Sequence, residues 1–273
     1  MLKNKEIIDR LTVKQKIELL TNFASFSDPA LRDIGVPSVS VKTADELLGN
    51  YESGLSVATL ARTWDADLVE KIVADAIQSE GEQGTDLLVV PSPKMKIEQL
   101  GSEQSEDPLL STTLSLAYLK GAGKSGCMGA VSDYQLRSDE ADQLDGQMDR
   151  RVFMEYFIRP FKKVAEIENC GALCGSVSDY GGQYGELNAR LLEEAESRIF
   201  KRPIQILCEA QTSEETVQAI QKGYVLLSGV PTALELAYEQ YASIKKAIEE
   251  GRLPMEALED AYVVHFHFTI CDL

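Results

Sequence analysis

Histidine is nearly absent from this chain, and positive charge is scarce. The only two histidines among 273 residues are His265 and His267, close to the C-terminus. A mechanism that needs a histidine in the middle of the chain is therefore excluded. Lysine and arginine number 27 against 44 aspartates and glutamates, which makes the formal net charge −17. A surface this negative repels phosphate backbones and anionic lipids, so we expect no nucleic-acid partner and no membrane partner.

Long apolar runs and a disulfide framework are also missing. The apolar runs are far shorter than the roughly 20 residues that cross a bilayer. Residues 1–5 lead into a charged amphipathic stretch rather than the apolar core of a signal sequence. The five cysteines are an odd set in a chain long enough to fold without disulfides. We therefore expect a cytoplasmic protein without a disulfide framework.

Short apolar runs do alternate with longer segments of helical periodicity along the chain. The predicted strands are residues 38–41, 87–90, 128–131, 172–177, 204–208 and 225–228, with a weaker candidate at 56–60. Most of these runs are rich in β-branched residues or leucine, which is typical of parallel strands buried on both faces. The pattern therefore indicates a parallel sheet rather than antiparallel hairpins.

Helix starts can be read between these strands. Thr12 and Gln15 have the spacing of a capping box, and Asp65 stands before a segment of helical periodicity. The regular alternation predicts an α/β fold, specifically a (β/α)8 TIM-like barrel that is complete or lacks one strand or helix. An open doubly wound sheet is the alternative. Since no linker or shift in composition interrupts the pattern, residues 1–273 are predicted to form one domain.

Two motifs that suggest a cofactor or a metal fail when their context is considered. Gly121, Gly123 and Gly126 match the dinucleotide pattern G-x-G-x-x-G, but that loop must follow a strand and precede a helix. Here a predicted helix comes first and a strand follows, so the glycines are predicted to make a helix-to-strand turn. In the acidic run that ends at Asp149, an EF-hand register places Ala141 at the first ligand position. We expect no cofactor and no bound metal.

Six short segments, read in order along the chain, point to one family. They are residues 11–17, 34–38, 61–65 (Ala-Arg-Thr-Trp-Asp), 105–108 (Ser-Glu-Asp-Pro), 149–161 and the segment that begins at Gly251. Together they resemble the N-terminal barrel of family 3 glycoside hydrolases of the β-glucosidase type. The resemblance implies a barrel that binds a carbohydrate or glycoside. Larger family members carry a second domain that can supply the acid/base, and we expect none in residues 1–273.

The family's functional positions are where this sequence departs from the pattern. By the resemblance, Thr43 replaces a sugar-binding Asp and Gln99 replaces a sugar-binding Arg. Asp133 replaces the His of a sugar-binding Lys-His pair, and Glu209 replaces the nucleophilic Asp. Tyr180 can offer an aromatic surface to a sugar ring. The candidate substrate-binding residues are therefore Thr43, Gln99, Asp133 and Tyr180.

The surviving carboxylates define the candidate catalytic residues. Glu209 follows the predicted strand 204–208, at the strand end where barrel active sites lie. Its side chain is one methylene longer than that of aspartate, and a displacement of ~1 Å can reduce a rate about 10²-fold. Asp179 follows another predicted strand in a glycine-containing loop and is the candidate acid/base. Clustered carboxylates raise one another's pKa, as a general acid requires.

Three functional hypotheses follow from this sequence. The preferred one is a degenerate family 3 barrel, a pseudoenzyme with little or no hydrolase activity that binds carbohydrate or serves as a regulatory or subunit protein. The alternative is a divergent retaining β-glycosidase with Glu209 as nucleophile. The third is a divalent-metal chemistry at Asp133, Asp179 and Glu209. Another protein chain that supplies the acid/base is a partner that the sequence leaves open.

Overall fold

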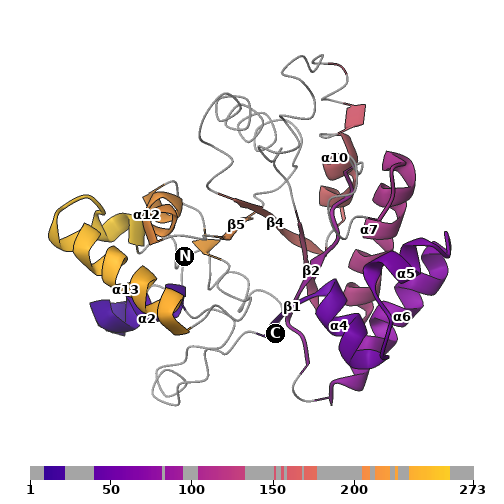
Figure 1. Ribbon diagram of the computed structural model, residues 1–273, viewed down its shortest axis with the longest axis horizontal. Helices are drawn as coiled ribbons and strands as arrows, with labels where there is room; N and C mark the ends of the chain where they lie inside the picture. The colour runs from indigo at the N-terminus through magenta and orange to yellow at the C-terminus, as the bar shows by residue number, and fades with distance from the viewer. Residues whose placement is uncertain are drawn as a thin grey trace. The chain divides into compact units, whose positions relative to one another are not determined.

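The computed structural model divides the chain into two compact units (Figure 1). Unit 1 comprises Met1–Ser40 and Gln205–Leu273, and unit 2 comprises Val41–Ile204. The structure describes residues 9–21, 40–81, 84–94, 104–132, 151, 155–156, 159–167, 169–176, 205–209, 213–221, 225–226 and 234–258. The prediction that residues 1–273 form one domain remains a prediction.

Unit 2 contains four parallel strands that pair in chain order. They are β1 (Val41–Thr43), β2 (Leu87–Val90), β3 (Met128–Val131) and β4 (Cys170–Ser176). The sequence predicted β2 and β3 with their observed bounds, and it placed β1 and β4 within a few residues. All four residues of β2 are buried, as expected for a strand covered on both faces.

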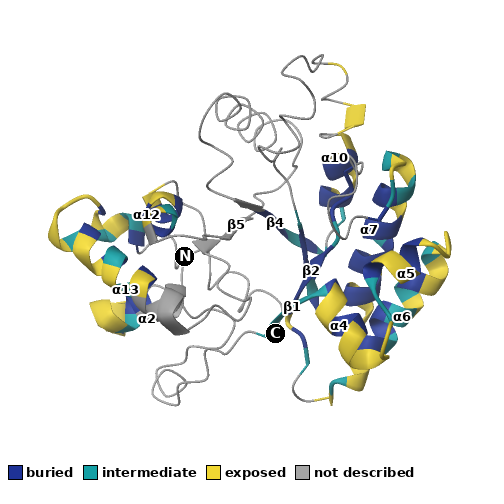
Figure 2. Ribbon diagram, in the orientation of Figure 1, coloured by how far each residue is buried: buried dark blue, intermediate teal, exposed yellow. Residues whose placement is uncertain are grey.

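Five described helices accompany these strands. They are α4 (Ala44–Tyr51), α5 (Val57–Ala61), α6 (Ala66–Ser79), α7 (Pro108–Lys124) and α10 (Arg159–Ala165). Figure 1 shows α4, α5, α6 and α7 on one side of β1 and β2, and Figure 2 shows buried residues where α6 and α7 meet. Strands that alternate with helices in one parallel sheet confirm the predicted α/β fold. Closure into an eight-stranded barrel remains a prediction.

The weak strand candidate at residues 56–60 is wrong, because this segment is the helix α5. The Ser56 hydroxyl accepts a hydrogen bond from the Thr59 backbone N–H at 3.1 Å, which makes Ser56 an N-cap. The buried residues of α5 are Val57, Leu60 and Ala61, at helical spacing. The run was too short for its periodicity to separate a strand from a helix.

The glycines of the dinucleotide-like pattern serve helix packing and helix termination. Gly121 lies inside α7, where an added Cβ would come within 2.6 Å of the Glu70 carbonyl oxygen on α6. Gly126 has φ +75° and lies in the turn between α7 and β3. A helix does precede the pattern and a strand follows it, as predicted. The helix is longer than expected, however, and includes both Gly121 and Gly123.

Unit 1 contains two described strands and three described helices. They are α2 (Val13–Thr21), β5 (Gln205–Glu209), α12 (Ser213–Gln221), β6 (Val225–Leu226) and α13 (Leu234–Glu249), and β5 pairs with β6 in parallel. The capping box predicted for α2 is confirmed, since Thr12 N–H donates to Gln15 Oε1 at 2.9 Å and Gln15 N–H donates to Thr12 Oγ1 at 3.2 Å. In the part of the chain that is described, no helix has both the length and the apolar character needed to cross a membrane.

Candidate functional site

The carboxyl ends of the parallel strands in unit 2 form the edge where a site is expected. The register pairs Thr43 with Val89 and Val90 with Val131, so β1, β2 and β3 end close to the same level. Side chains that follow these strands are therefore brought to one edge of the sheet. Of the residues predicted for the site, Thr43 lies at this edge with its side chain described.

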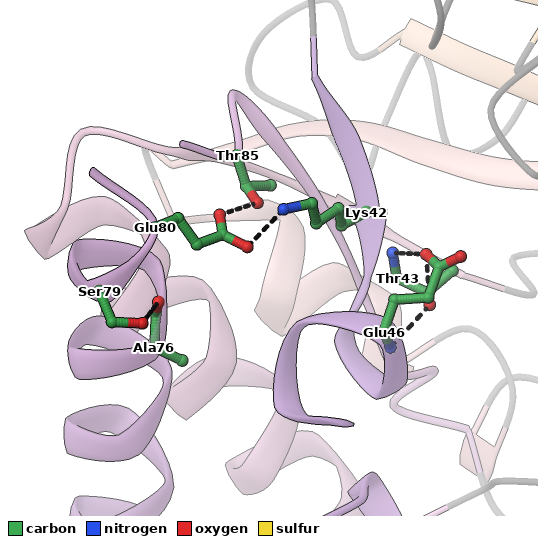
Figure 3. A network of polar contacts seen from close by, with 7 residues as sticks. All are labelled: Lys42, Thr43, Glu46, Ala76, Ser79, Glu80 and Thr85. Carbon is green, nitrogen blue, oxygen red and sulfur yellow. Dashed lines mark hydrogen bonds and ion pairs between the residues drawn. The ribbon is translucent and has the colours of Figure 1, made fainter. Parts of the chain in front are cut away.

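Thr43 ends β1 and is also the N-cap of α4 (Figure 3). Its backbone N–H donates to Glu46 Oε2 at 2.8 Å, and its hydroxyl donates to the same oxygen at 2.9 Å. The Glu46 backbone N–H donates in return to Thr43 Oγ1 at 3.2 Å. This is a complete capping box, and it occupies the proton and one lone pair of the Thr43 hydroxyl. A ligand that uses this hydroxyl as a donor must compete with Glu46.

The neighbouring Lys42 is committed to a different contact. Figure 3 shows Lys42 on one side of β1, where it reaches Glu80, which also contacts Thr85; Thr43 and Glu46 lie on the other side. The Lys42 ammonium group pairs with Glu80 Oε1, and the Thr85 hydroxyl donates to Glu80 Oε2 at 2.6 Å. These groups tie β1 to the end of α6 and to the segment before β2. The positive charge closest to the end of β1 in sequence is thus used to hold the fold together.

The segment that follows β2 contains polar residues that sequence reasoning did not single out. Ser92 and Lys94 are both buried, with Lys94 only 1% exposed, and the Lys94 backbone N–H donates to Ser92 Oγ at 3.3 Å. Gln104, which is 7% exposed, donates from Nε2 to the Ser92 carbonyl oxygen at 3.1 Å. The available signal was the run Pro-Ser-Pro-Lys directly after a predicted strand, a place where functional residues of parallel sheets gather.

Two of the segments that carried the family resemblance start helices. In Ser105-Glu106-Asp107-Pro108, the Asp107 carboxylate accepts the Leu109 N–H at 2.7 Å, and Pro108 opens α7. In residues 61–65, the Asp65 carboxylate accepts the Leu68 N–H at 3.0 Å, which confirms the predicted N-cap of α6. Both motifs therefore have a structural role that is independent of any ligand.

The remaining predicted site residues differ in how far they are described. Glu209 is the last residue of β5 in unit 1, so it stands at the carboxyl end of a parallel strand, as the sequence predicted. Gln99, Asp133, Asp179 and Tyr180 lie outside the described residues. Their roles, and that of Glu209 as a nucleophile, stay predictions.

Two buried groups have pKa values that remove them as candidate acids, bases or nucleophiles at neutral pH. Burial raises the pKa of the Cys127 thiol from its ordinary value of 9.0 to about 12, and the nearby Asp86 and Glu80 add to the shift. Burial, with a smaller contribution from Asp45, also raises the pKa of Tyr118 well above its usual range. Among the described residues there is no group of three or more His, Cys, Asp or Glu side chains that could hold a metal ion.

Comparison with known proteins finds similarity to β-glucosidases. No protein-family model matches the chain. It is 20% identical over 268 residues to a β-glucosidase of Rhizobium radiobacter, covering 93% of this chain and 32% of that protein. It is 24% identical over 258 residues to β-glucosidase B of Emericella nidulans, covering 88% of this chain and 30% of that protein. The chain thus spans about a third of the length of these relatives.

Solved structures of glycoside-processing enzymes share its fold. The β-glucoside phosphorylase BglX matches with a TM-score of 0.68 and 14% identity, over 97% of this chain and 59% of that one. β-Glucosidase 3B of Thermotoga neapolitana, in complex with glycerol, matches with a TM-score of 0.63 and 18% identity, over 95% of this chain and 41% of that one. A family 3 glycosyl hydrolase of Mycobacterium smegmatis matches with a TM-score of 0.64 and 12% identity, over 96% of this chain and 97% of that one. The resemblance to the N-terminal domain of family 3 glycoside hydrolases is confirmed.

Proposed function

We propose that this chain, a glycoside-hydrolase-like protein of the family 3 type, binds carbohydrate with little or no hydrolase activity and has a regulatory or subunit role. The observation that carries the proposal is the capping box at the end of β1. By the resemblance, this strand end presents a sugar-binding carboxylate in the family. Here Thr43 occupies the position, and its hydroxyl is bonded to Glu46 in both directions.

The same strand end keeps one group that suits a sugar hydroxyl. Glu46 is exposed, and its two bonds from Thr43 both go to Oε2. The carboxylate is therefore held by two hydrogen bonds to one of its oxygens, and a carboxylate has further lone pairs that can accept from a hydroxyl donor. A fixed acceptor supports ligand binding, but hydrolysis with retention requires two carboxyl groups ~5–5.5 Å apart across the glycosidic bond. The described part of this edge therefore supports ligand binding rather than hydrolysis.

A hydrolysis and binding experiment tests the proposal. Release of aryl groups is measured from a panel of aryl β- and α-glycosides, and glucose binding is measured by titration calorimetry or NMR. We expect glucose binding in the millimolar range and no aryl release above background. If protein that melts cooperatively does not bind glucose, the proposed binding function fails, and aryl release above background would contradict the proposed loss of hydrolase activity.

A divergent retaining β-glycosidase is the second candidate, and the position of Glu209 favours it. Glu209 ends β5 at the carboxyl end of a parallel strand pair, where a nucleophile is expected. If this function holds, Glu209→Gln abolishes aryl release while the melting temperature is unchanged. Glu249→Gln is the matched control, because Glu249 is an exposed glutamate on α13. If the wild type releases aryl groups and Glu209→Gln releases them as well, Glu209 is excluded as the nucleophile.

A further inference from the structure

The Gln104 side chain connects two segments of the chain, the residues that follow β2 and the first turns of α7. Its Nε2 donates to the Ser92 carbonyl oxygen at 3.1 Å, to the Ser111 carbonyl oxygen at 3.2 Å and to Ser115 Oγ at 2.7 Å. Two of these acceptors are backbone carbonyls, which only accept hydrogen bonds. The amide nitrogen of Gln104 must therefore face these two carbonyls, because the reversed amide would place Oε1, an acceptor, against two carbonyl oxygens that are also acceptors.

Ser115 extends this contact to the preceding residue. Its hydroxyl accepts from Gln104 and donates to the Pro91 carbonyl oxygen at 2.8 Å. The two residues that follow β2 thus have both carbonyls held, Pro91 by Ser115 and Ser92 by Gln104. Pro91 and Pro93 have no backbone N–H, so these carbonyls are the main backbone groups by which the segment can be held. The Lys94 N–H closes the turn onto Ser92 Oγ.

Gln104 makes these bonds although its other amide atom is unsatisfied. The side chain is 7% exposed, and no hydrogen-bond donor reaches Oε1 in the described part of the chain. A buried acceptor without a donor opposes folding. The hydrogen bonds that this side chain makes all come from its Nε2 group. Those donors all act on the segment after β2 and on the first turns of α7.

We propose that Gln104 is a positioning residue that fixes the Pro91–Lys94 segment for ligand binding at the carboxyl edge. The inference rests on the proposed carbohydrate-binding function. Thr43 pairs with Val89, two residues before Pro91, so the segment continues β2 beside the strand end that carries Thr43 and Glu46. A shift of the segment changes the level at which β2 ends relative to β1. Gln104 itself, being buried, acts through this segment and does not touch the ligand.

The test compares Gln104→Glu with Ser115→Ala and a matched control. Gln104→Glu keeps the shape of the side chain but removes the Nε2 donors. Gln221→Glu makes the same chemical change at an exposed residue of unit 1, where Nε2 donates to the Arg252 carbonyl oxygen at 2.8 Å. Two quantities are measured at a temperature where every variant is fully folded: the Kd for glucose, and the hydrogen-exchange rate of the Lys94 amide.

We expect Gln104→Glu to weaken glucose binding at least tenfold and to speed exchange of the Lys94 amide at least tenfold. Ser115→Ala should show a smaller change in the same direction, and Gln221→Glu should match the wild type. Ser115→Ala decides the question if Gln104→Glu does not fold. Variants that melt earlier but keep the wild-type Kd and exchange rate would overturn the proposal, since a purely structural role predicts that result. If the wild type binds no glucose, the proposed function fails, and the exchange rate alone decides whether Gln104 holds the segment.

Discussion

The capping box between Thr43 and Glu46 makes a quantitative prediction about the end of β1. Thr43→Ala removes the hydroxyl that donates to Glu46 Oε2 at 2.9 Å and accepts from the Glu46 N–H at 3.2 Å. The Thr43 backbone N–H keeps its own bond to Glu46. Loss of a Ser or Thr N-cap typically costs about 1 kcal/mol, within a range of 0.5–2. We expect the free energy of unfolding to fall by about 1 kcal/mol, which lowers the melting temperature by roughly 2–4 °C.

Thr43→Ser is the matched control because serine keeps the hydroxyl and is as good an N-cap as threonine. Its unfolding free energy should stay within about 0.5 kcal/mol of the wild type, the usual range of neutral substitutions. The double variant Thr43→Ala/Glu46→Ala should be more stable than the sum of the two single effects predicts. The two residues share their hydrogen bonds, and each single substitution already breaks them.

Urea unfolding followed by circular dichroism is measured for the wild type, the three single variants Thr43→Ala, Thr43→Ser and Glu46→Ala, and the double variant, and glucose binding is measured on the same samples. Under the capping interpretation, Thr43→Ala is less stable than the wild type, and Thr43→Ser keeps the stability of the wild type. If Thr43→Ala has the stability of the wild type, or if the two single effects simply add, the capping box does not stabilise α4. Loss of glucose binding in Thr43→Ala without loss of stability would instead support the sequence prediction that Thr43 contacts the ligand directly.

Three further predictions concern the packing and ionisation of unit 2. Gly121→Ala should destabilise the protein by about 1–3 kcal/mol in urea unfolding, because its Cβ would lie 2.6 Å from the Glu70 carbonyl oxygen. Gly49→Ala lies in α4, where the added Cβ has no neighbouring atom within 4 Å, and it should stabilise the protein by up to about 1 kcal/mol. Equal effects of the two substitutions would contradict the packing argument. Tyr118→Phe removes a buried hydroxyl that has no hydrogen-bond partner among the described residues, so thermal unfolding should show equal or higher stability, and a clear loss of stability would contradict this argument. The pKa of Cys127 is raised from 9.0 to about 12, so the contribution of its protonated thiol to the free energy of unfolding is fully present below pH 9 and is lost as the pH rises from 9 to 12. Over this window the wild type should lose more stability than Cys127→Ala, with a slope of up to about 1.4 kcal/mol per pH unit. Parallel stability profiles for the two proteins would contradict this prediction.

Local signals in the sequence were sufficient for the elements whose stabilisation is local. Thr12 with Gln15 and Asp65 with Leu68 are N-caps that depend on contacts three residues apart, and the structure confirms both. The buried strand β2 was predicted with its observed bounds because four consecutive apolar residues fit a strand covered on both faces. The same reasoning failed at residues 56–60, where Ser56 could be recognised as an N-cap only once the helix was known.

The sequence also contained a local signal that was not used. Thr43 and Glu46 have the capping-box spacing, but Thr43 was assigned to ligand binding by the family resemblance. A residue at a strand end that also begins a helix can serve both roles. Sequence order does not reveal which hydrogen bonds the hydroxyl makes, because the competing partners are defined by the backbone conformation.

The sequence by itself determined the α/β alternation, the helix starts at Thr12 and Asp65, and the order of a helix followed by a strand around Gly126. These features depend on periodicity and on neighbours within one helical turn. Only the tertiary structure decided that Lys42 pairs with Glu80, 38 residues away, and that Gln104 holds the carbonyls of Ser92 and Ser111. Such contacts depend on how β1, β2 and α7 are placed in space. A polar side chain finds its partner only after the hydrophobic packing of strands and helices has brought those segments together.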